Sequence, residues 1–239
     1  GYRSPILALR KRFDLFANLR PARSDDIDLL IVRENTEGLY SGRERVEDEG
    51  ATAIAERVIT RCASERIVRA ACEQAMQRRR KLTIVHKANV LKETCGLFRR
   101  AAFEVTAGYP DLQVEEMLVD TAAMRLVQEG TRFDVIVTTN LFGDILSDLA
   151  AGLTGGLGIA PSANIGVGRP AVFEPVHGSA PDIAGKGIAD PRAALLSTAM
   201  LLDFLGYRSE AQRLTAACYA IEHTGSTADT TDAIIKSIK

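Results

Sequence analysis

The chain has 239 residues, of which 46% are hydrophobic, so it can form one large domain or two small ones around a substantial core. Thirty basic and thirty-one acidic residues leave a net charge of −1, which excludes an overall field that would favour nucleic acid or an anionic membrane. We therefore expect a small-molecule partner. No apolar run is long enough to span a bilayer, and a cytoplasmic or organelle-matrix location is expected, with the cytoplasm first.

The four cysteines, Cys62, Cys72, Cys95 and Cys218, show no CxxC pairing, and we expect reduced core thiols. The chain begins at Gly1 without an initiator Met and already has a helix-like pattern at Ile6. This start predicts that an upstream part of the fold is absent from the sequence.

The first third of the chain places basic residues at the ends of predicted elements. A helix is predicted over residues 3–15, with Pro5 at its start, and strands over residues 15–21 and 27–32. A weak strand pair follows within residues 41–60. The remaining elements before the centre of the chain alternate between helix and strand, at residues 63–80, 82–86, 91–107, 114–119 and 121–128. This alternation predicts an α/β core with a largely parallel sheet.

Residues 133–152 join a buried strand to a helix that has two carboxylates on one side. Asp144 and Asp148 lie four residues apart, and an apolar stripe is expected beside them at Leu141, Ile145, Leu149 and Leu153. Like charges at this spacing repel unless a positive group lies between them, and carboxylate oxygens suit Mg²⁺ or Mn²⁺. A solvated helix face with two Asp is the alternative interpretation.

The last third begins with a glycine-rich turn region at residues 155–166. A strand over residues 171–174 leads into a long loop, residues 175–191, and loops of this length in compact domains are usually functional. Three helices are then predicted, at residues 192–205, 209–222 and 231–238.

Six motifs in this order resemble the metal- and nicotinamide-dependent β-decarboxylating dehydrogenases, a family with isocitrate, homoisocitrate, 3-isopropylmalate and tartrate members. They are RSPILALR with NLRP, RENTEGLY, HKANVL, VDTAAM, TTNLFGDILSDLAAGLTGGLG and EPVHGSAPDIAGKGIADP. The resemblance runs from Gly1 to about Leu205 and is closest to homoisocitrate dehydrogenase. Three departures are the missing N-terminal segment, the absent Pro-Asp-Leu-Gly-Gly loop between Gly225 and Thr230, and a short acidic start at residues 24–26 in place of a longer loop.

The resemblance implies an isopropylmalate/isocitrate dehydrogenase-like α/β fold rather than a Rossmann fold. It combines a largely parallel sheet with flanking helices and a smaller α/β subdomain that forms a dimer. Residues 1–20 with 133–239 would belong to the large nucleotide-binding domain, and residues 21–132 to the smaller substrate and dimerisation domain. The family forms homodimers or tetramers of dimers.

The resemblance also assigns the substrate site. Arg10, Arg20 and Arg33 would bind the malate part, and guanidinium groups pair bidentately with carboxylates, although three surface salt bridges are the alternative. Further substrate contacts are expected from the residues Arg3, Ser4, Tyr40, Lys87 and Asn89.

Catalysis and metal binding are assigned to the same group of motifs. Asp120, Asp144 and Asp148 resemble the ligands of a divalent metal, and the first would come from the partner subunit. Lys87, also from across the dimer, would take the hydroxyl proton, since burial or a nearby cation can turn a lysine into a base. Tyr40 would protonate the enol after CO₂ leaves. An ordinary packing role is the alternative for this tyrosine.

The loop after His177 resembles the adenosine-binding loop of the family. A carboxylate at Asp182, followed by Ile183, suits the ribose hydroxyls of NAD and would repel a 2′-phosphate, so the cofactor is expected to be NAD. NADP-dependent members have Lys and Tyr there. Asp190 stands where the family usually has Asn beside the adenine. For His177, a buried structural role is the alternative. The expected cofactor contacts are His177, Gly178, Ser179, Ala180, Asp182, Ile183 and Asp190.

The residues at the start of the chain indicate which acid is the substrate. Isocitrate members have Ser-Leu-Asn where this chain has Ser4-Pro5-Ile6, and isopropylmalate members have leucines. Ile6 replaces the Asn that donates a hydrogen bond in isocitrate members, and this change favours a longer acid. Homoisocitrate is therefore the first candidate, isocitrate the second and 3-isopropylmalate the third. A non-catalytic regulatory subunit and a plain nucleotide-binding module are the alternatives from other classes.

Overall fold

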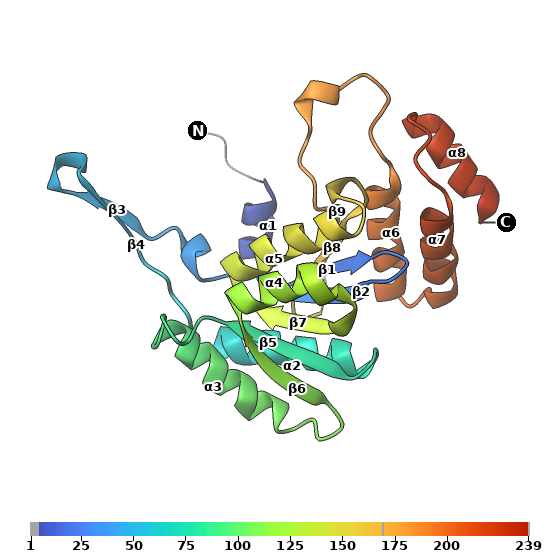
Figure 1. Cartoon of the computed structure of the whole chain (residues 1–239). Helices are drawn as coiled ribbons and strands as arrows, with labels where there is room; N and C mark the ends of the chain where they lie inside the picture. Colours follow the sequence, from blue (N-terminus) through green and yellow to red (C-terminus); the bar gives the residue numbers. More distant parts are fainter. Residues whose placement is uncertain (1–4, 169, 239) are drawn as a thin grey trace. The chain divides into compact units, whose positions relative to one another are not determined.

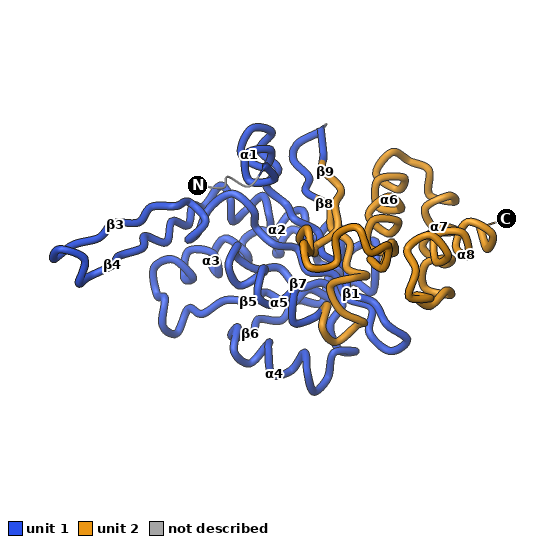
Figure 2. The backbone as a smooth tube through the Cα atoms, turned by 90° about the horizontal axis from the view of Figure 1, so that it is seen from above, with its two compact units in different colours: residues 1–150, 164–171 blue, residues 151–163, 172–239 orange. Residues whose placement is uncertain are grey.

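The computed structural model describes residues 5–168 and 170–238. The contacts divide the chain into two compact units, shown in Figure 2. Unit 1 consists of residues 1–150 and 164–171, and unit 2 of residues 151–163 and 172–239. These boundaries differ from those expected near residues 20 and 132, and the division into a nucleotide-binding and a dimer-forming domain stays a prediction.

Unit 1 is built on a mostly parallel sheet with the strand order β6-β5-β7-β2-β1. The strands β2, β7, β5 and β6 run parallel to one another, whereas β1 runs antiparallel to β2. The β-branched residues of β2, β5 and β7 are fully buried, as in Ile31, Ile84 and Ile136, which is typical of strands covered on both faces. The bounds are β1 (Ala17–Arg23), β2 (Asp28–Glu34), β5 (Lys81–His86), β6 (Gln113–Leu118) and β7 (Val135–Thr138).

Helices cover the sheet of unit 1. Figure 2 shows α2 and α4 on opposite sides of β5 and β7. The α2 helix begins after Thr60, whose side chain accepts a hydrogen bond from the backbone of Ala63. Ala63, Ile67, Ala71 and Ala75, spaced four residues apart along this helix, are buried. The helices are α1 (Pro5–Arg12), α2 (Arg61–Met76), α3 (Thr94–Thr106), α4 (Val119–Glu129) and α5 (Asn140–Leu153). The predicted α/β fold with a largely parallel sheet is confirmed.

A two-stranded hairpin extends from unit 1, drawn in blue in Figure 1. It consists of β3 (Glu44–Glu47) and β4 (Thr52–Ala55), which are antiparallel with Glu44 opposite Ala55. The predicted strand pair is therefore confirmed. Val46 in this hairpin is 66% exposed.

In the described residues, no helix has the length and apolar character needed to cross a membrane.

Unit 2 is largely helical and has its own core. The predicted helices are confirmed as α6 (Arg192–Phe204), α7 (Arg208–Ala220) and α8 (Thr227–Ser237). Leu196, Ala199, Leu214, Ala217, Cys218 and Ile234 form the buried cluster. Ser226 caps α8 by accepting a hydrogen bond from the backbone of Asp229. A short strand, β9 (Val172–Pro175), precedes the long loop.

Three expectations about local structure were wrong. Residues 155–166 are not only turns, because they contain β8 (Pro161–Ile165), whose last two residues belong to unit 1. The apolar stripe of α5 is placed differently, since Ile145 is 57% exposed while Leu146 and Ala150 are buried. All four cysteines are free, but Cys62 is exposed rather than part of the core.

Candidate active site

Several of the predicted site residues of unit 1 lie at one edge of the sheet. Asn18 of β1 lies opposite Arg33 at the end of β2, and Arg33 lies opposite Thr138 at the end of β7. Lys87 directly follows β5, and α5 begins directly after β7. Ligands of open α/β sheets bind outside the carboxyl ends of the parallel strands, so this edge is the expected position for a site.

Arg33 connects β2 to the aspartates of α5. Its side chain is 1% exposed, and its Nη1 pairs with Oδ1 of Asp144. Its Nε donates to Oδ1 of Asn140 at 2.9 Å, and its guanidinium lies 5.0 Å from the centre of the Tyr40 ring. A guanidinium this deeply buried is stable only with such partners.

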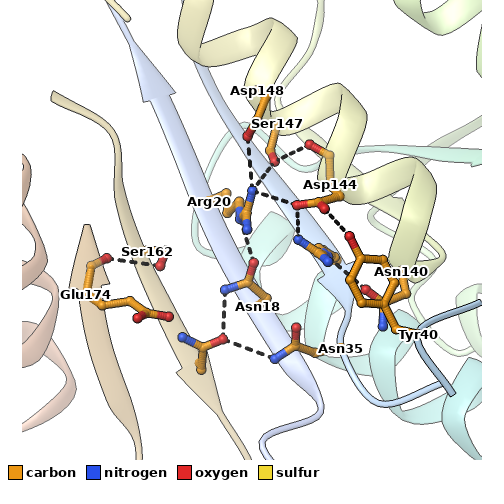
Figure 3. Close-up of polar contacts among 12 residues, drawn as sticks. Asn18, Arg20, Asn35, Tyr40, Asn140, Asp144, Ser147, Asp148, Ser162 and Glu174 are labelled. Atoms are coloured by element: carbon orange, nitrogen blue, oxygen red, sulfur yellow. Dashed lines mark hydrogen bonds and ion pairs between the residues drawn. The ribbon is translucent and has the colours of Figure 1, made fainter. Parts of the chain in front are cut away.

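Arg20 lies between the two aspartates of α5, as Figure 3 shows. Its Nη1 is 3.2 Å from Oδ1 of Asp144 and 3.2 Å from Oδ1 of Asp148, and it also donates to Ser147 Oγ at 2.7 Å. The repulsion between the aspartates is therefore compensated within the chain. Burial and the charge of Arg33 lower the pKa of Arg20 from its ordinary value, while both aspartates oppose this shift.

Tyr40 donates its hydroxyl proton to Oδ2 of Asp144 in a hydrogen bond. Burial and this carboxylate raise the pKa of Tyr40, so the phenol holds its proton at neutral pH. Burial alone would raise the pKa of Asp144 as well. The bond from Tyr40 and the charges of Arg33 and Arg20 outweigh burial and hold the pKa of Asp144 below its ordinary value. The predicted acid and the predicted metal ligand are thus in direct contact.

The other predicted substrate residues are placed differently. Arg10 is the buried residue of α1, and its Nε donates to Oδ1 of Asn164 at 2.9 Å. Asn89 is exposed in the turn after β5. Arg3 and Ser4 lie outside the described residues.

Lys87 and Asp120 pair with each other. The Lys87 Nζ is 2.6 Å from Oδ1 of Asp120, which lies in the first turn of α4. This hydrogen bond is the main cause of a lowered pKa for Asp120. The backbone N–H of Lys87 donates to the buried sulfur of Cys95 at 3.3 Å, which fixes the start of the turn. The HKANVL and VDTAAM motifs therefore form one polar pair.

The carboxylates fit a divalent cation only in part. Asp144 and Asp148 both contact the cationic Nη1 of Arg20, so a positive group is accommodated between them. Within residues 5–168 and 170–238, no three acidic, histidine or cysteine side chains are grouped closely enough to hold a metal. One chain therefore brings two of the three predicted ligands together, and Asp120 is paired with Lys87 instead.

The predicted cofactor loop belongs to unit 2. Asp182 and Ile183 lie in a short 3-10 helix (Pro181–Ile183), where Asp182 is exposed. His177 is exposed, so a buried structural role for it is wrong; its Nδ1 lies 2.9 Å from the carbonyl oxygen of Gly178. Gly178 and Ser179 are also exposed, and Ala180 has a left-handed backbone with φ of 42°.

Asp190 has a partner in its own loop. Its carboxylate pairs with the guanidinium of Arg192 at 2.7 Å and accepts a hydrogen bond from the Arg192 backbone at 2.9 Å. Burial alone would raise the pKa of Asp190, but the hydrogen bonds and charge of Arg192 lower it. The adenine contact expected of Asp190 stays a prediction, and the structure adds a role at the start of α6.

Four residues of the site were not predicted to bind anything. They are polar side chains that contact the arginines, namely Asn18, Asn140, Ser147 and Asn164. The signal available in the sequence was an Asn two residues before Arg20 on the same face of a strand, a spacing too common to be specific.

Comparisons with known proteins agree with this geometry. Residues 2–237 match the family described as isocitrate/isopropylmalate dehydrogenase. The isocitrate/homoisocitrate dehydrogenase of Thermus thermophilus is 52% identical, with 100% of this chain and 76% of that protein covered. The 3-isopropylmalate dehydrogenase of Archaeoglobus fulgidus is 54% identical over 87% of this chain and 66% of its own length. The solved isocitrate dehydrogenase from Methylococcus capsulatus is 44% identical, with a TM-score of 0.93 over 100% of this chain and 77% of its own.

The match covers nearly the whole chain, and the two relatives are more than 50% identical over the aligned residues. The resemblance read from the motifs is therefore confirmed, as is the enzyme class of β-decarboxylating dehydrogenase. The chain belongs to the isocitrate/isopropylmalate dehydrogenase family.

Proposed function

We propose that this chain catalyses the NAD-dependent oxidative decarboxylation of a 3-substituted (2R,3S)-malate, with homoisocitrate as the first choice. The products would be 2-oxoadipate, CO₂ and NADH. The observation that supports this best is the group of buried arginines beside two paired aspartates and a tyrosine at one sheet edge. Three guanidinium groups suit a substrate with several carboxylates.

Binding of the acid is assigned to Arg10, Arg20 and Arg33. All three are at most 9% exposed, so their charges are poorly hydrated before the ligand arrives. A carboxylate that enters replaces the missing water with charge-assisted hydrogen bonds. The arginines would thereby orient the malate portion against Tyr40 and α5, which reduces the entropy lost at the reacting carbon.

Asp144 and Asp148, with Asp120 of a second chain as the third ligand, would hold Mg²⁺ or Mn²⁺. When bound, such an ion polarises the hydroxyl and stabilises negative charge that develops on its oxygen. The two aspartates would exchange Arg20 for the ion, which leaves the Arg20 guanidinium available to the substrate.

The proton steps are assigned to two side chains. Lys87 would take the proton of the substrate hydroxyl as the hydride leaves the same carbon for NAD. The adjacent carboxylate then leaves as CO₂, and its bonding electrons form the enolate of the product. Tyr40 would donate a proton to the enolate carbon, which gives the 2-oxo acid, and its raised pKa keeps the phenol protonated for that step. Solvent would return the proton to the phenolate.

The cofactor proposal is based on the exposed loop of unit 2. Asp182 presents a carboxylate that can accept bonds from two ribose hydroxyls, and it would repel a 2′-phosphate. Ile183 next to it offers no charge or hydroxyl to such a phosphate. NAD is therefore proposed over NADP.

The choice among acids is based on Ile6 and on the relatives. Ile6 lies in the first turn of α1, and it replaces an amide donor that isocitrate members have. One relative is named for both isocitrate and homoisocitrate, and another for 3-isopropylmalate. A methylene changes specificity by only about 1–3 kcal/mol, so isocitrate is the second candidate and 3-isopropylmalate the third.

A shared site requires at least a homodimer, and a tetramer of dimers is the larger alternative. Lys87 and Asp120 form one half-site, while Tyr40, Asp144 and Asp148 form the other. The helices α4 and α5 expose apolar side chains that a second copy would cover, at Met124 and Val127 of α4 and Ile145 of α5. The cytoplasmic location stays a prediction.

The test is a steady-state assay of homoisocitrate, isocitrate and 3-isopropylmalate, each with NAD or NADP and with Mg²⁺ or Mn²⁺. We expect the highest kcat/KM for homoisocitrate with NAD. A higher value for isocitrate would contradict only the order of the acids. No turnover of any acid, although a metal-loaded dimer is present, would contradict the enzyme proposal and favour a regulatory subunit.

A further inference from the structure

The long loop of unit 2, residues 175–191, has little apolar packing of its own. Residues 184–189 are exposed, and among them Ile188 is 44% exposed. Backbone hydrogen bonds within the loop join residues three apart, such as the bond from the N–H of Lys186 to the oxygen of Ile183 at 3.1 Å. A segment with so few buried contacts opens locally unless another part of the chain holds it. Its contacts with other elements therefore decide how well the loop is ordered.

Three consecutive carbonyl groups of this loop meet donors from the segment that joins α7 to α8. The backbone N–H of Thr227 donates to the oxygen of Gly187 at 2.8 Å, and the Thr227 hydroxyl donates to the oxygen of Ala189 at 2.5 Å. Between these two bonds, Nε2 of His223 lies 3.1 Å from the oxygen of Ile188. A carbonyl oxygen only accepts, so Nε2 carries the proton of this bond. Figure 1 shows the loop, in orange, beside the segment that leads into α8, in red.

The donors are fixed to a packed helix. The hydroxyl of the buried Thr230 donates to the backbone oxygen of Ser226 at 2.7 Å, and its oxygen lies 3.0 Å from Nδ1 of His223. Ser226 caps α8, and Ile234 of the same helix belongs to the core of unit 2. The imidazole of His223 is therefore held at both nitrogens, one by α8 and one by the loop.

The end of the loop is joined to the same segment by Arg192. Its Nη2 pairs with the carboxylate of Asp190 at 2.7 Å, and its Nη1 donates to the backbone oxygen of Ile221 at 3.2 Å. Each residue from 187 to 190 thus has a contact that leads to residues 221–227. These contacts connect an exposed loop to the packed helices of unit 2.

We propose that His223 and Thr227 are positioning residues, which hold this loop in the conformation that binds the cofactor. The inference rests on the proposed function, in that the loop binds the adenosine part of NAD. When only a fraction of the molecules has the binding conformation, the measured Kd equals the intrinsic Kd divided by that fraction. The two side chains act on the backbone between Asp182 and Asp190, and contact of either with NAD is not required.

The first experiment measures the Kd of NADH by calorimetry with the full chain. Thr227→Val keeps the backbone N–H and the shape of the side chain but removes the hydroxyl that bonds Ala189. We expect the Kd to rise about fivefold, the factor of one lost hydrogen bond. Thr227→Ser restores a hydroxyl and should bind within about twofold of the wild type.

Thr231→Val is the matched control for that substitution. It makes the same change one turn later in α8, where the hydroxyl donates to the backbone oxygen of Thr227 within the helix at 2.7 Å. The control should leave the Kd of NADH unchanged.

His223→Leu and His223→Gln form the second pair of variants. Leucine removes the donor to Ile188, whereas the amide nitrogen of glutamine can donate in its place. We expect the Kd of NADH to rise about fivefold in the first variant and to be largely restored in the second. Without NADH, the N–H of Thr227, which bonds Gly187, should exchange with solvent about fivefold faster in His223→Leu.

Steady-state kinetics separate positioning from a general loss of stability. The KM for NAD should rise by the same factor as the Kd in Thr227→Val and His223→Leu, while kcat stays within about twofold of the wild type. This pattern is expected because the adenosine part is bound equally in the ground state and the transition state.

The inference fails if Thr227→Val and His223→Leu bind NADH as tightly as the wild type, or if Thr231→Val weakens binding by the same factor. A fall in kcat with an unchanged KM for NAD also contradicts it. In these cases a wild type that binds NADH leaves the proposed function intact. A wild type that binds no NADH contradicts the proposed function and, with it, the inference.

Discussion

Gly143 of α5 lies directly against the side chain of Arg33. A Cβ atom on Gly143 would be 2.6 Å from Cγ and 2.7 Å from Cβ of Arg33, both far inside contact distance. Gly143 has no side chain, and this lets α5 approach β2 closely enough for Asp144 to reach Arg33.

Gly143→Ala should displace Arg33 or move α5 away from the sheet. We expect a loss of about 1–3 kcal/mol in the free energy of unfolding, as for other overpacked sites, and at least a tenfold lower kcat/KM for the acid. Gly152→Ala is the matched control in the same helix, because a Cβ there meets nothing within 4 Å. That variant should be unchanged or up to about 1 kcal/mol more stable. Equal effects of the two would contradict the close approach.

Asp144→Asn should require more Mg²⁺ for half-maximal activity and should also destabilise the chain. If repulsion from Asp148 were the only interaction of Asp144, the substitution would not reduce the free energy of unfolding. Asp144 is, however, in contact with Arg20, Arg33 and Tyr40. Loss of the anion leaves Arg33 buried with weaker partners, and we expect about 2 kcal/mol of lost stability at pH 7. The Asp148→Asn variant is the control, and it should lose less stability because Asp148 is exposed. Equal losses would contradict the contact geometry.

The stability difference between wild type and Asp144→Asn should depend on pH. Because the pKa of Asp144 is below its ordinary value in the folded chain, its contribution is complete above the unfolded pKa of about 3.9 and is lost as the pH falls further. Urea unfolding at pH 7 and near pH 3 measures this. The two proteins should differ at neutral pH and converge in acid, and a constant difference would show that the charge is not responsible.

Asp182→Lys with Ile183→Tyr should shift kcat/KM toward NADP. A cation then meets the 2′-phosphate where the wild type presents an anion, and the shift should exceed tenfold. Asp203→Lys makes the same charge change at another exposed position of unit 2 and should leave the preference unchanged. A wild type that already prefers NADP would show that the loop is wrongly assigned.

Lys87→Ala and Asp144→Ala chains should each be nearly inactive alone and should recover activity after subunit exchange. In a mixed dimer with shared sites, one site has both lesions and the other has neither. Activity per mixed dimer should approach half of the wild-type value. Mixing without exchange is the control. Confirmed exchange with no recovery would show that Lys87 acts within its own chain.

The sequence predicted the sheet and its helices because these depend on short-range patterns. It did not predict β8, because Pro161, Gly158 and Gly166 resemble turn signals although a strand lies between the last two. It misplaced the apolar stripe of α5, because periodicity cannot indicate that Gly143 and Leu146, rather than Leu141 and Ile145, face the sheet.

The arginine partners were beyond sequence reasoning for a different reason. Asn140 lies 107 residues from Arg33, and Asn164 lies 154 residues from Arg10. The first contact arises only when β2 meets α5 and the second only when α1 meets β8, and nothing local in the chain specifies which asparagine meets which guanidinium. The arginines themselves were found because family motifs include them.

The ion pairs of Arg20 with both aspartates imply thermodynamic linkage between the acid and the divalent cation. Arg20 and Arg33 together balance the charges of Asp144 and Asp148, so these four side chains attract neither a trianion nor a dication strongly. A cation that replaces Arg20 makes that guanidinium available, and an acid that captures the guanidinium makes the carboxylates available. Each ligand should therefore lower the dissociation constant of the other by the same factor, so that the two bind as a cooperative pair.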